Sequence, residues 1–96
     1  MRIPDKTGHV ELPLSEMHPG EDGHILAING DPAIRQHLLE MGFTIGAPVE
    51  FIRAAPLSDP ITVRIRGYQL SLRRREADSI WMRRCPPEIF NTSQGA

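Results

Sequence analysis

The sequence is short of cysteine, of long apolar runs and of net charge. Its 96 residues include one cysteine, Cys85, which excludes an intrachain disulfide framework. No stretch approaches the roughly 18 apolar residues of a membrane-spanning helix, and the N-terminus lacks the basic-then-apolar order of a signal peptide. A single domain in the reducing cytoplasm, without insertion into a membrane, is therefore expected.

Catalytic motifs are missing as well. The chain has no GxxxxGK phosphate loop, no nucleophile elbow and no CxxC pair. Its carboxylates are scattered, so no tight pair indicates an acid and a base at one scissile bond. The thiol of Cys85 has no histidine near it in sequence. These absences predict a binding protein and not an enzyme.

Charge is unevenly distributed although the formal net charge is only -1. Residues 1–50 hold three basic and eight acidic groups, and residues 51–96 hold eight basic and four acidic groups. All eight basic groups of the second half are arginine, which favours planar hydrogen bonding to carboxylate or phosphate. The near-neutral balance argues against a domain that depends on nucleic-acid backbone contacts, so no nucleic-acid partner is expected.

Four histidines lie in the acidic half: His9, His18, His24 and His37. Their spacing matches no zinc-ligand motif, which favours solvated surface side chains and no required cofactor. His37 and Glu40 are three residues apart on an expected helix and share its face. A weak or interfacial divalent-metal site, including one between two copies in a homodimer, stays open as an alternative.

The first half of the chain predicts one strand followed by one helix. Residues 24–29 form an apolar run of strand length, which Asn29-Gly30 ends. Asp31 and Pro32 are typical of a helix N-cap and first turn, and Gly42 is typical of the residue after a helix end. A short inserted helix is expected at about residues 31–41.

The second half predicts further strands. Residues 46–55 are strand-like, and 56–60 form a loop that begins and ends with proline. Apolar and polar residues then alternate over 61–66, as in a strand with one buried face. A helical turn near 74–79 and a closing strand at 80–83 follow.

Glycine placement predicts a hairpin with Gly67-Tyr68 as its two-residue loop. In that register Ile65 faces Leu70 and Val63 faces Leu72 on the inner face. The outer face then carries a row of polar and arginine side chains, formed by Thr62, Arg64, Arg66, Gln69, Ser71 and Arg73.

These elements predict a mainly β fold, a small SH3-like partly open β-barrel of five to six strands with the inserted helix. The expected domain spans residues 12–84. Residues 1–11 are expected to be a flexible N-terminal segment and residues 85–96 a flexible C-terminal tail.

Three linked sequence blocks resemble the FeoA family. They are Leu38-Leu39-Glu40-Met41-Gly42-Phe43 with Gly46, Ala55-Pro56-Leu57-Ser58-Asp59-Pro60, and Arg66-Gly67-Tyr68-Gln69-Leu70-Ser71-Leu72-Arg73. The resemblance implies a cytosolic accessory protein of bacterial ferrous iron uptake with an SH3-like barrel. It further implies a partner, the GTPase part of the FeoB membrane transporter. The chain departs from the family at Gln36-His37, where a basic pair is common, and at Ile45, where proline is common.

Partner contacts are expected on loops and side chains that a rigid scaffold presents to solvent. The end of the inserted helix, the loop after the strand at 46–55 and the arginine-bearing face of the hairpin meet this description. The predicted partner-binding residues are Leu39, Leu57, Ser58, Asp59, Arg64, Arg66, Arg73 and Arg74.

Overall fold

The computed structural model describes residues 10–85, apart from the side chain of Ser58. Its strands and helices are β1 (Val10–Pro13), β2 (Asp22–Ile28), α1 (Pro32–Glu40), β3 (Pro48–Ala54), β4 (Ile61–Ile65), β5 (Tyr68–Leu72), α2 (Arg74–Asp78) and β6 (Ile80–Arg84). Two 3₁₀ turns, η1 (Leu14–Glu16) and η2 (Pro56–Ser58), follow β1 and β3. The mainly β architecture predicted from the sequence is confirmed, with six strands.

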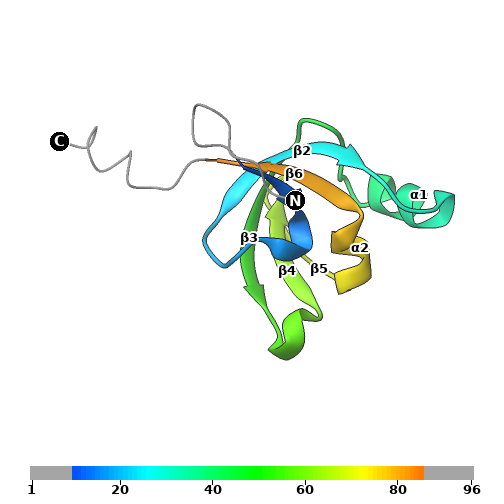
Figure 1. Cartoon of the computed structure of the whole chain (residues 1–96). Helices are drawn as coiled ribbons and strands as arrows, with labels where there is room; N and C mark the ends of the chain where they lie inside the picture. The colour runs from blue at the N-terminus through cyan, green and yellow to red at the C-terminus, as the bar shows by residue number, and fades with distance from the viewer. Residues whose placement is uncertain (1–9, 86–96) are drawn as a thin grey trace.

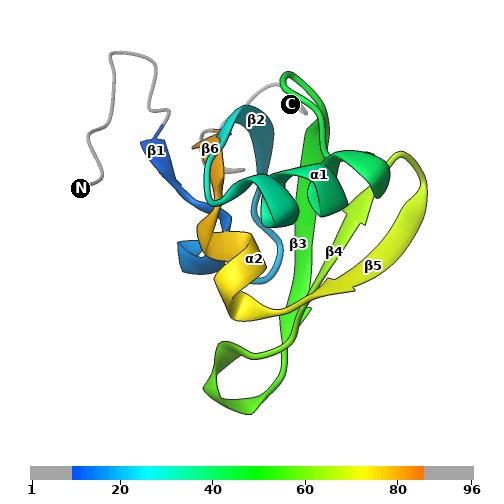
Figure 2. The same ribbon diagram turned by 90° about the vertical axis from the view of Figure 1, so that its right-hand side faces the viewer.

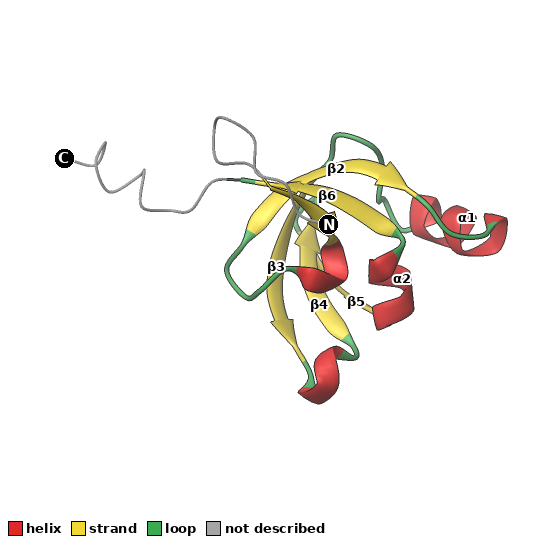
Figure 3. Ribbon diagram, viewed as in Figure 1, coloured by secondary structure: helices red, strands yellow, loops and turns green. Residues whose placement is uncertain are grey.

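All six strands belong to one antiparallel sheet in the order β1-β6-β2-β3-β4-β5. Figures 1 and 3 show the sheet curving around its inner face, with α1 at one end and α2 beside β6. Because β1 and β5 each have a single neighbour, the sheet is an open barrel. Within residues 10–85 neither helix has the length and apolar character needed to cross a membrane.

Both ends of the described chain take part in the sheet. β1 begins at Val10, two residues before the expected start of the domain, and pairs with β6. The amide of Cys85 donates to the carbonyl oxygen of Asp22 at 2.8 Å. Of the segments expected to be flexible, 1–11 and 85–96, the structure describes only Val10, Glu11 and Cys85, and these are hydrogen-bonded to or part of the sheet.

Alternating side chains of the strands fill the core. Along β4, Ile61, Val63 and Ile65 are at most 1% exposed, whereas Thr62 and Arg64 lie on the outer face. Phe51 of β3 and Phe43, which follows α1, are at most 2% exposed and are the largest fully buried side chains. Burying each such side chain stabilises the fold by roughly 1.5–3 kcal/mol relative to leaving it exposed.

Local capping explains the bounds of α1. The carboxylate of Asp31 accepts a hydrogen bond from the amide of Ile34 at 2.9 Å, as the N-cap prediction requires. At the other end Gly42 adopts φ 104°, and the amide of Phe43 donates to the carbonyl oxygen of Leu38. Leu38 and Phe43 are both fully buried. Figure 2 shows α1 crossing the end of the sheet where β2 ends and β3 begins.

The predicted hairpin register is wrong by two residues. The loop is Arg66-Gly67, with φ 52° and 84°, and the pairs are Ile65 with Tyr68, and Val63 with Leu70. Positive φ at both loop residues matches the twist of the strands, and glycine occupies the second position. The inner and outer faces of the two strands are still as predicted, since a shift of two residues preserves the alternation.

α2 confirms the helical turn predicted near 74–79. The carboxylate of Glu76 accepts a hydrogen bond from the amide of Arg73 at 2.8 Å, which satisfies a donor at the helix start. The hydroxyl of Ser15 in η1 donates to the carboxylate of Asp78 at the end of α2. α2 is thereby linked to the segment that follows β1.

Replacing Gly23 with alanine tests the contact between β2 and β6. A Cβ at this position would lie 2.8 Å from Cα of Arg84 and closer still to the carbonyl oxygen of Arg83. Because both atoms are backbone, the strands must separate, and we expect a loss of at least about 3 kcal/mol in the free energy of unfolding. Urea denaturation of the variant and the wild type measures this difference in the free energy of unfolding.

Gly20→Ala is the control for this experiment. A Cβ there meets no atom within 4 Å, although φ is 90°. Only the left-handed conformation is disfavoured, at about 1–2 kcal/mol. A smaller loss for Gly23→Ala than for Gly20→Ala would contradict the tight packing of β2 on β6.

Asp31→Ala tests the N-cap of α1. Losing the carboxylate leaves the amide of Ile34 without its acceptor, and we expect the free energy of unfolding to fall by about 1 kcal/mol. Asp31→Asn keeps a capping oxygen and should stay close to wild type in the same denaturation experiment. Equal losses in the two variants would show that the cap hydrogen bond is not the cause.

Candidate protein-interaction surfaces

The structure separates the predicted partner-binding residues into three places along the β4–β5 hairpin. Leu39 lies in the last turn of α1, and Arg66 lies in the hairpin turn, where it donates to the segment that follows α1. Arg64 lies midway, on the outer face of β4. The remaining residues lie at the opposite end of the hairpin, where β3 connects to β4 and β5 connects to α2: Leu57, Ser58, Asp59, Arg73 and Arg74.

The first place is organised by Arg66. Its Nε donates to the carbonyl oxygen of Gly42 at 3.2 Å, and its Nη2 donates to Oγ1 of Thr44 at 2.7 Å. These bonds join the hairpin turn to the segment after α1. We call this region the α1-end surface and define it as Leu39, Ile45, Arg66 and Tyr68.

Three apolar or aromatic side chains of the α1-end surface face solvent. Leu39 is 41% exposed, Ile45 70% and Tyr68 67%. The sequence prediction included Leu39 and missed the other two. Ile45 had a signal, since it stands where the resembled family commonly has proline. Tyr68 had one too, since the predicted register placed it in the hairpin loop, where a side chain faces solvent.

The second place is the loop between β3 and β4, the short helical turn at the bottom of Figure 3. Leu57 adopts φ 69° and ψ 15° there and is 92% exposed. Oδ2 of Asp59 accepts from Nη2 of Arg73 at 3.2 Å, and Oδ1 accepts from the amide of Arg74 at 3.1 Å. We call Leu57, Asp59, Arg73 and Arg74 the loop surface. The predicted Ser58 belongs to this loop by its backbone.

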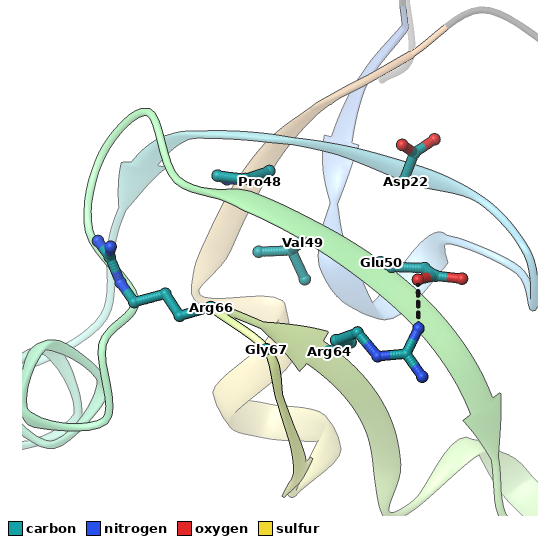
Figure 4. A pocket seen from close by; sticks show the side chains of 7 residues that line it. All are labelled: Asp22, Pro48, Val49, Glu50, Arg64, Arg66 and Gly67. Atoms are coloured by element: carbon teal, nitrogen blue, oxygen red, sulfur yellow. Dashed lines mark hydrogen bonds and ion pairs between the residues drawn. The ribbon is translucent and has the colours of Figure 1, made fainter.

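The third place is an open pocket of about 340 Å³ on the outer face of the sheet. Figure 4 shows the ion pair between Nη1 of Arg64 and Oε1 of Glu50, 2.8 Å apart, and Arg66 directed away from it. Asp22 lies opposite Glu50 on the neighbouring strand. Two carboxylates and two guanidinium groups line this pocket, so its lining has no excess of positive charge that would favour an anion.

The pairing of outer-face side chains expected on the hairpin is wrong, because Thr62 faces Ser71 and Arg64 faces Gln69. It assumed a register in which Arg66 faces Gln69 and Arg73 faces Thr62. In the structure Arg66 belongs to the turn, and Arg73 follows the end of β5. Arg64, Arg66 and Arg73 each donate to a different intramolecular acceptor.

The described histidines, His18, His24 and His37, are exposed, as the sequence predicted. Nε2 of His37 lies 3.5 Å from Oε2 of Glu76, so His37 connects α1 to α2. Glu40, its expected neighbour, accepts from the side chain of Gln36. Among the described residues no group of three or more histidine, cysteine or acidic side chains could hold a metal ion. His9 lies outside this range.

The thiol of Cys85 has little thiolate character. Partial burial, and then the negative charge of Asp22, raise the pKa of Cys85 above its ordinary value. Reactive cysteines require the opposite shift. The surfaces described above, and not this thiol, are the candidate sites of function.

Comparison with known proteins identifies the family. The FeoA domain family model matches residues 12–84. A protein of Porphyromonas gingivalis, described as a fusion of Fe(2+) transport protein A with the Fe(2+) transporter FeoB, is 42% identical over 67 residues. That match covers 70% of this chain and only 8% of the fusion protein.

Two solved structures of FeoA proteins have the same fold. FeoA of Chlorobium tepidum is 36% identical with a TM-score of 0.69, and the match covers 75% of this chain and 69% of that one. FeoA of Stenotrophomonas maltophilia, described as a procaryotic SH3 domain protein and crystallised with zinc, is 25% identical with a TM-score of 0.64. The match covers 72% of this chain and 86% of that one. The predicted SH3-like fold is confirmed, and the chain belongs to the FeoA family, which is linked to ferrous iron transport.

Proposed function

We propose that this protein is a cytoplasmic accessory protein of bacterial ferrous iron uptake that binds the GTPase part of a FeoB-type membrane transporter. The observation that carries the proposal is the Porphyromonas gingivalis relative, in which a FeoA part and a FeoB transporter share one polypeptide. Two parts of one polypeptide meet at a raised effective concentration, which favours a direct contact between them. We infer the same contact for this chain.

The surface of the domain supports a role in binding. Ile45, Leu57 and Tyr68 are each at least 67% exposed and stand on segments that hydrogen bonds hold to the rest of the fold. Exposed apolar side chains on a rigid support are typical of protein-interaction sites. The α1-end surface and the loop surface are the two candidate contact regions, with the outward-facing Arg64 between them.

A binding measurement tests this function. The full-length FeoB-type transporter of the same organism, in detergent micelles, is immobilised and the complete 96-residue chain is added. We expect saturable binding with a Kd of about 50 µM or tighter. A transporter variant without its GTPase part is the control and should bind no more than an empty micelle. Equal binding to both forms would contradict contact with the GTPase part.

A metal-responsive module is the second candidate function. Zinc in the crystal of the Stenotrophomonas maltophilia relative favours it, together with the His37–Glu76 pair, whose histidine side chain is 55% exposed. Two such pairs from two copies would supply the four ligands that a structural zinc site needs. In that case the active form would be a homodimer.

Calorimetric titration with Zn²⁺, or with Fe²⁺ under anaerobic conditions, separates the two functions. For an accessory protein alone we expect no stoichiometric heat. The metal-responsive module predicts one metal ion per two chains, and His37→Ala should abolish the heat. Gln36→Ala, on the same helix, is the matched control. Stoichiometric heat that His37→Ala removes would overturn the metal-free proposal.

A further inference from the structure

Leu57 occupies a position that folding does not explain. At φ 69° its backbone is left-handed, a conformation that disfavours every residue with a Cβ and favours glycine or asparagine. Its side chain is 92% exposed, so it adds nothing to the core. Neither the backbone preference nor apolar burial accounts for leucine here, and residues held in disfavoured backbone conformations cluster at functional sites.

Two sets of bonds make the loop that carries Leu57 rigid. The amide of Ala55 donates to the carbonyl oxygen of Pro60 at 2.9 Å, which closes the base of the loop. The carboxylate of Asp59 binds both the guanidinium of Arg73 and the amide of Arg74, which fixes the loop to the start of α2. A preorganised apolar side chain loses little conformational entropy when it binds.

Charge around the loop is mainly positive. Arg53, at the end of β3, is exposed, and so are Arg73 and Arg74 at the start of α2. Asp59, in the loop itself, offsets one of these charges through its ion pair with Arg73. An apolar side chain with a net positive border complements an apolar pocket bordered by carboxylates.

We propose that Leu57 is the anchor of this protein on its partner, inserting into a small apolar pocket bordered by acidic side chains on the transporter's GTPase part. The inference rests on the proposed function and adds to it the contact region and the chemistry of the partner's site. It selects the loop surface, at the opposite end of the hairpin from α1, as the primary contact (Figure 1).

A protein pocket fits this loop better than a lipid surface. Even a single myristoyl chain gives only marginal membrane binding, and it buries many more methylene groups than one leucine. A protein pocket, in contrast, encloses a side chain on all sides, and a few such residues supply most of the affinity of an interface. The arginines then contribute to the association rate and to orientation.

Four variants of the complete chain, titrated against the full-length transporter in detergent micelles, test the proposal. We expect Leu57→Ala to weaken binding about tenfold to a hundredfold, from the loss of one buried apolar side chain. Leu57→Gly should weaken binding at least as much without lowering the melting temperature, because glycine relieves the left-handed strain. Leu39→Ala, the same truncation on the α1-end surface, should cost less. Arg74→Ala should mainly slow association and reduce its salt dependence.

The outcomes distinguish this inference from the function on which it rests. If wild type binds and Leu57→Ala binds within about twofold of it, or Leu39→Ala costs more, the anchor is elsewhere and only this inference fails. If wild type does not bind the transporter, both fail. Co-sedimentation with phosphatidylglycerol vesicles that Leu57→Ala abolishes, with transporter binding unchanged, would assign Leu57 to the membrane and overturn the inference.

Discussion

The close contact of β2 with β6 is the constraint on which the rest of this fold depends. β6, the last strand, lies between β1 and β2, the first two, so the sheet forms only when distant parts of the chain meet. At Gly23 the two backbones approach so closely that no side chain fits between them. This approach aligns Ile25 of β2 with Met82 of β6, both of them buried. Pairings this far apart in sequence close large loops, which is entropically costly before the core contacts form.

With that contact in place, the β4–β5 hairpin becomes a rigid support with a different surface at each end. At the turn, Arg66 binds the segment after α1 through Gly42 and Thr44. At the other end, Asp59 binds the start of α2. Both surfaces are therefore held by side-chain bonds between segments that are far apart in sequence. A binding site needs such support if its exposed side chains are to keep one orientation.

Sequence patterns predicted the helices and strands whose formation depends on residues that are neighbours in the chain. Asp31 and Gly42 bound α1 because capping depends on residues within one turn of each end. The alternation of Ile61, Val63 and Ile65 identified the buried face of β4 for the same kind of reason. β1 is only four residues long, with Leu12 its single buried side chain, and so had too little pattern to be recognised as a strand.

The hairpin register and the arginine partners could not be predicted, because both depend on tertiary contacts. A left-handed arginine is disfavoured on its own, and local preference pointed to a loop starting at Gly67. In the structure the bonds from Arg66 to Gly42 and Thr44, more than twenty residues away, accompany the left-handed turn. The partners of Arg64 and Arg73, Glu50 and Asp59, are likewise each 14 residues away. The predicted arrangement of these arginines was therefore wrong, and their contact with a partner stays a prediction.

Within residues 10–85, the two left-handed residues other than glycine differ in how the fold compensates their backbone conformation. Arg66 is disfavoured by its backbone, but its guanidinium forms two hydrogen bonds that offset the cost within the domain. Leu57 bears the same disfavoured conformation, and its own side chain gains no such compensation, since it lies almost wholly in solvent. Residues whose disfavoured backbone conformation is not compensated by other interactions of the fold are expected mainly at functional sites. By this criterion Arg66 belongs to the folding of the domain, whereas Leu57 is the residue that we propose contacts a partner.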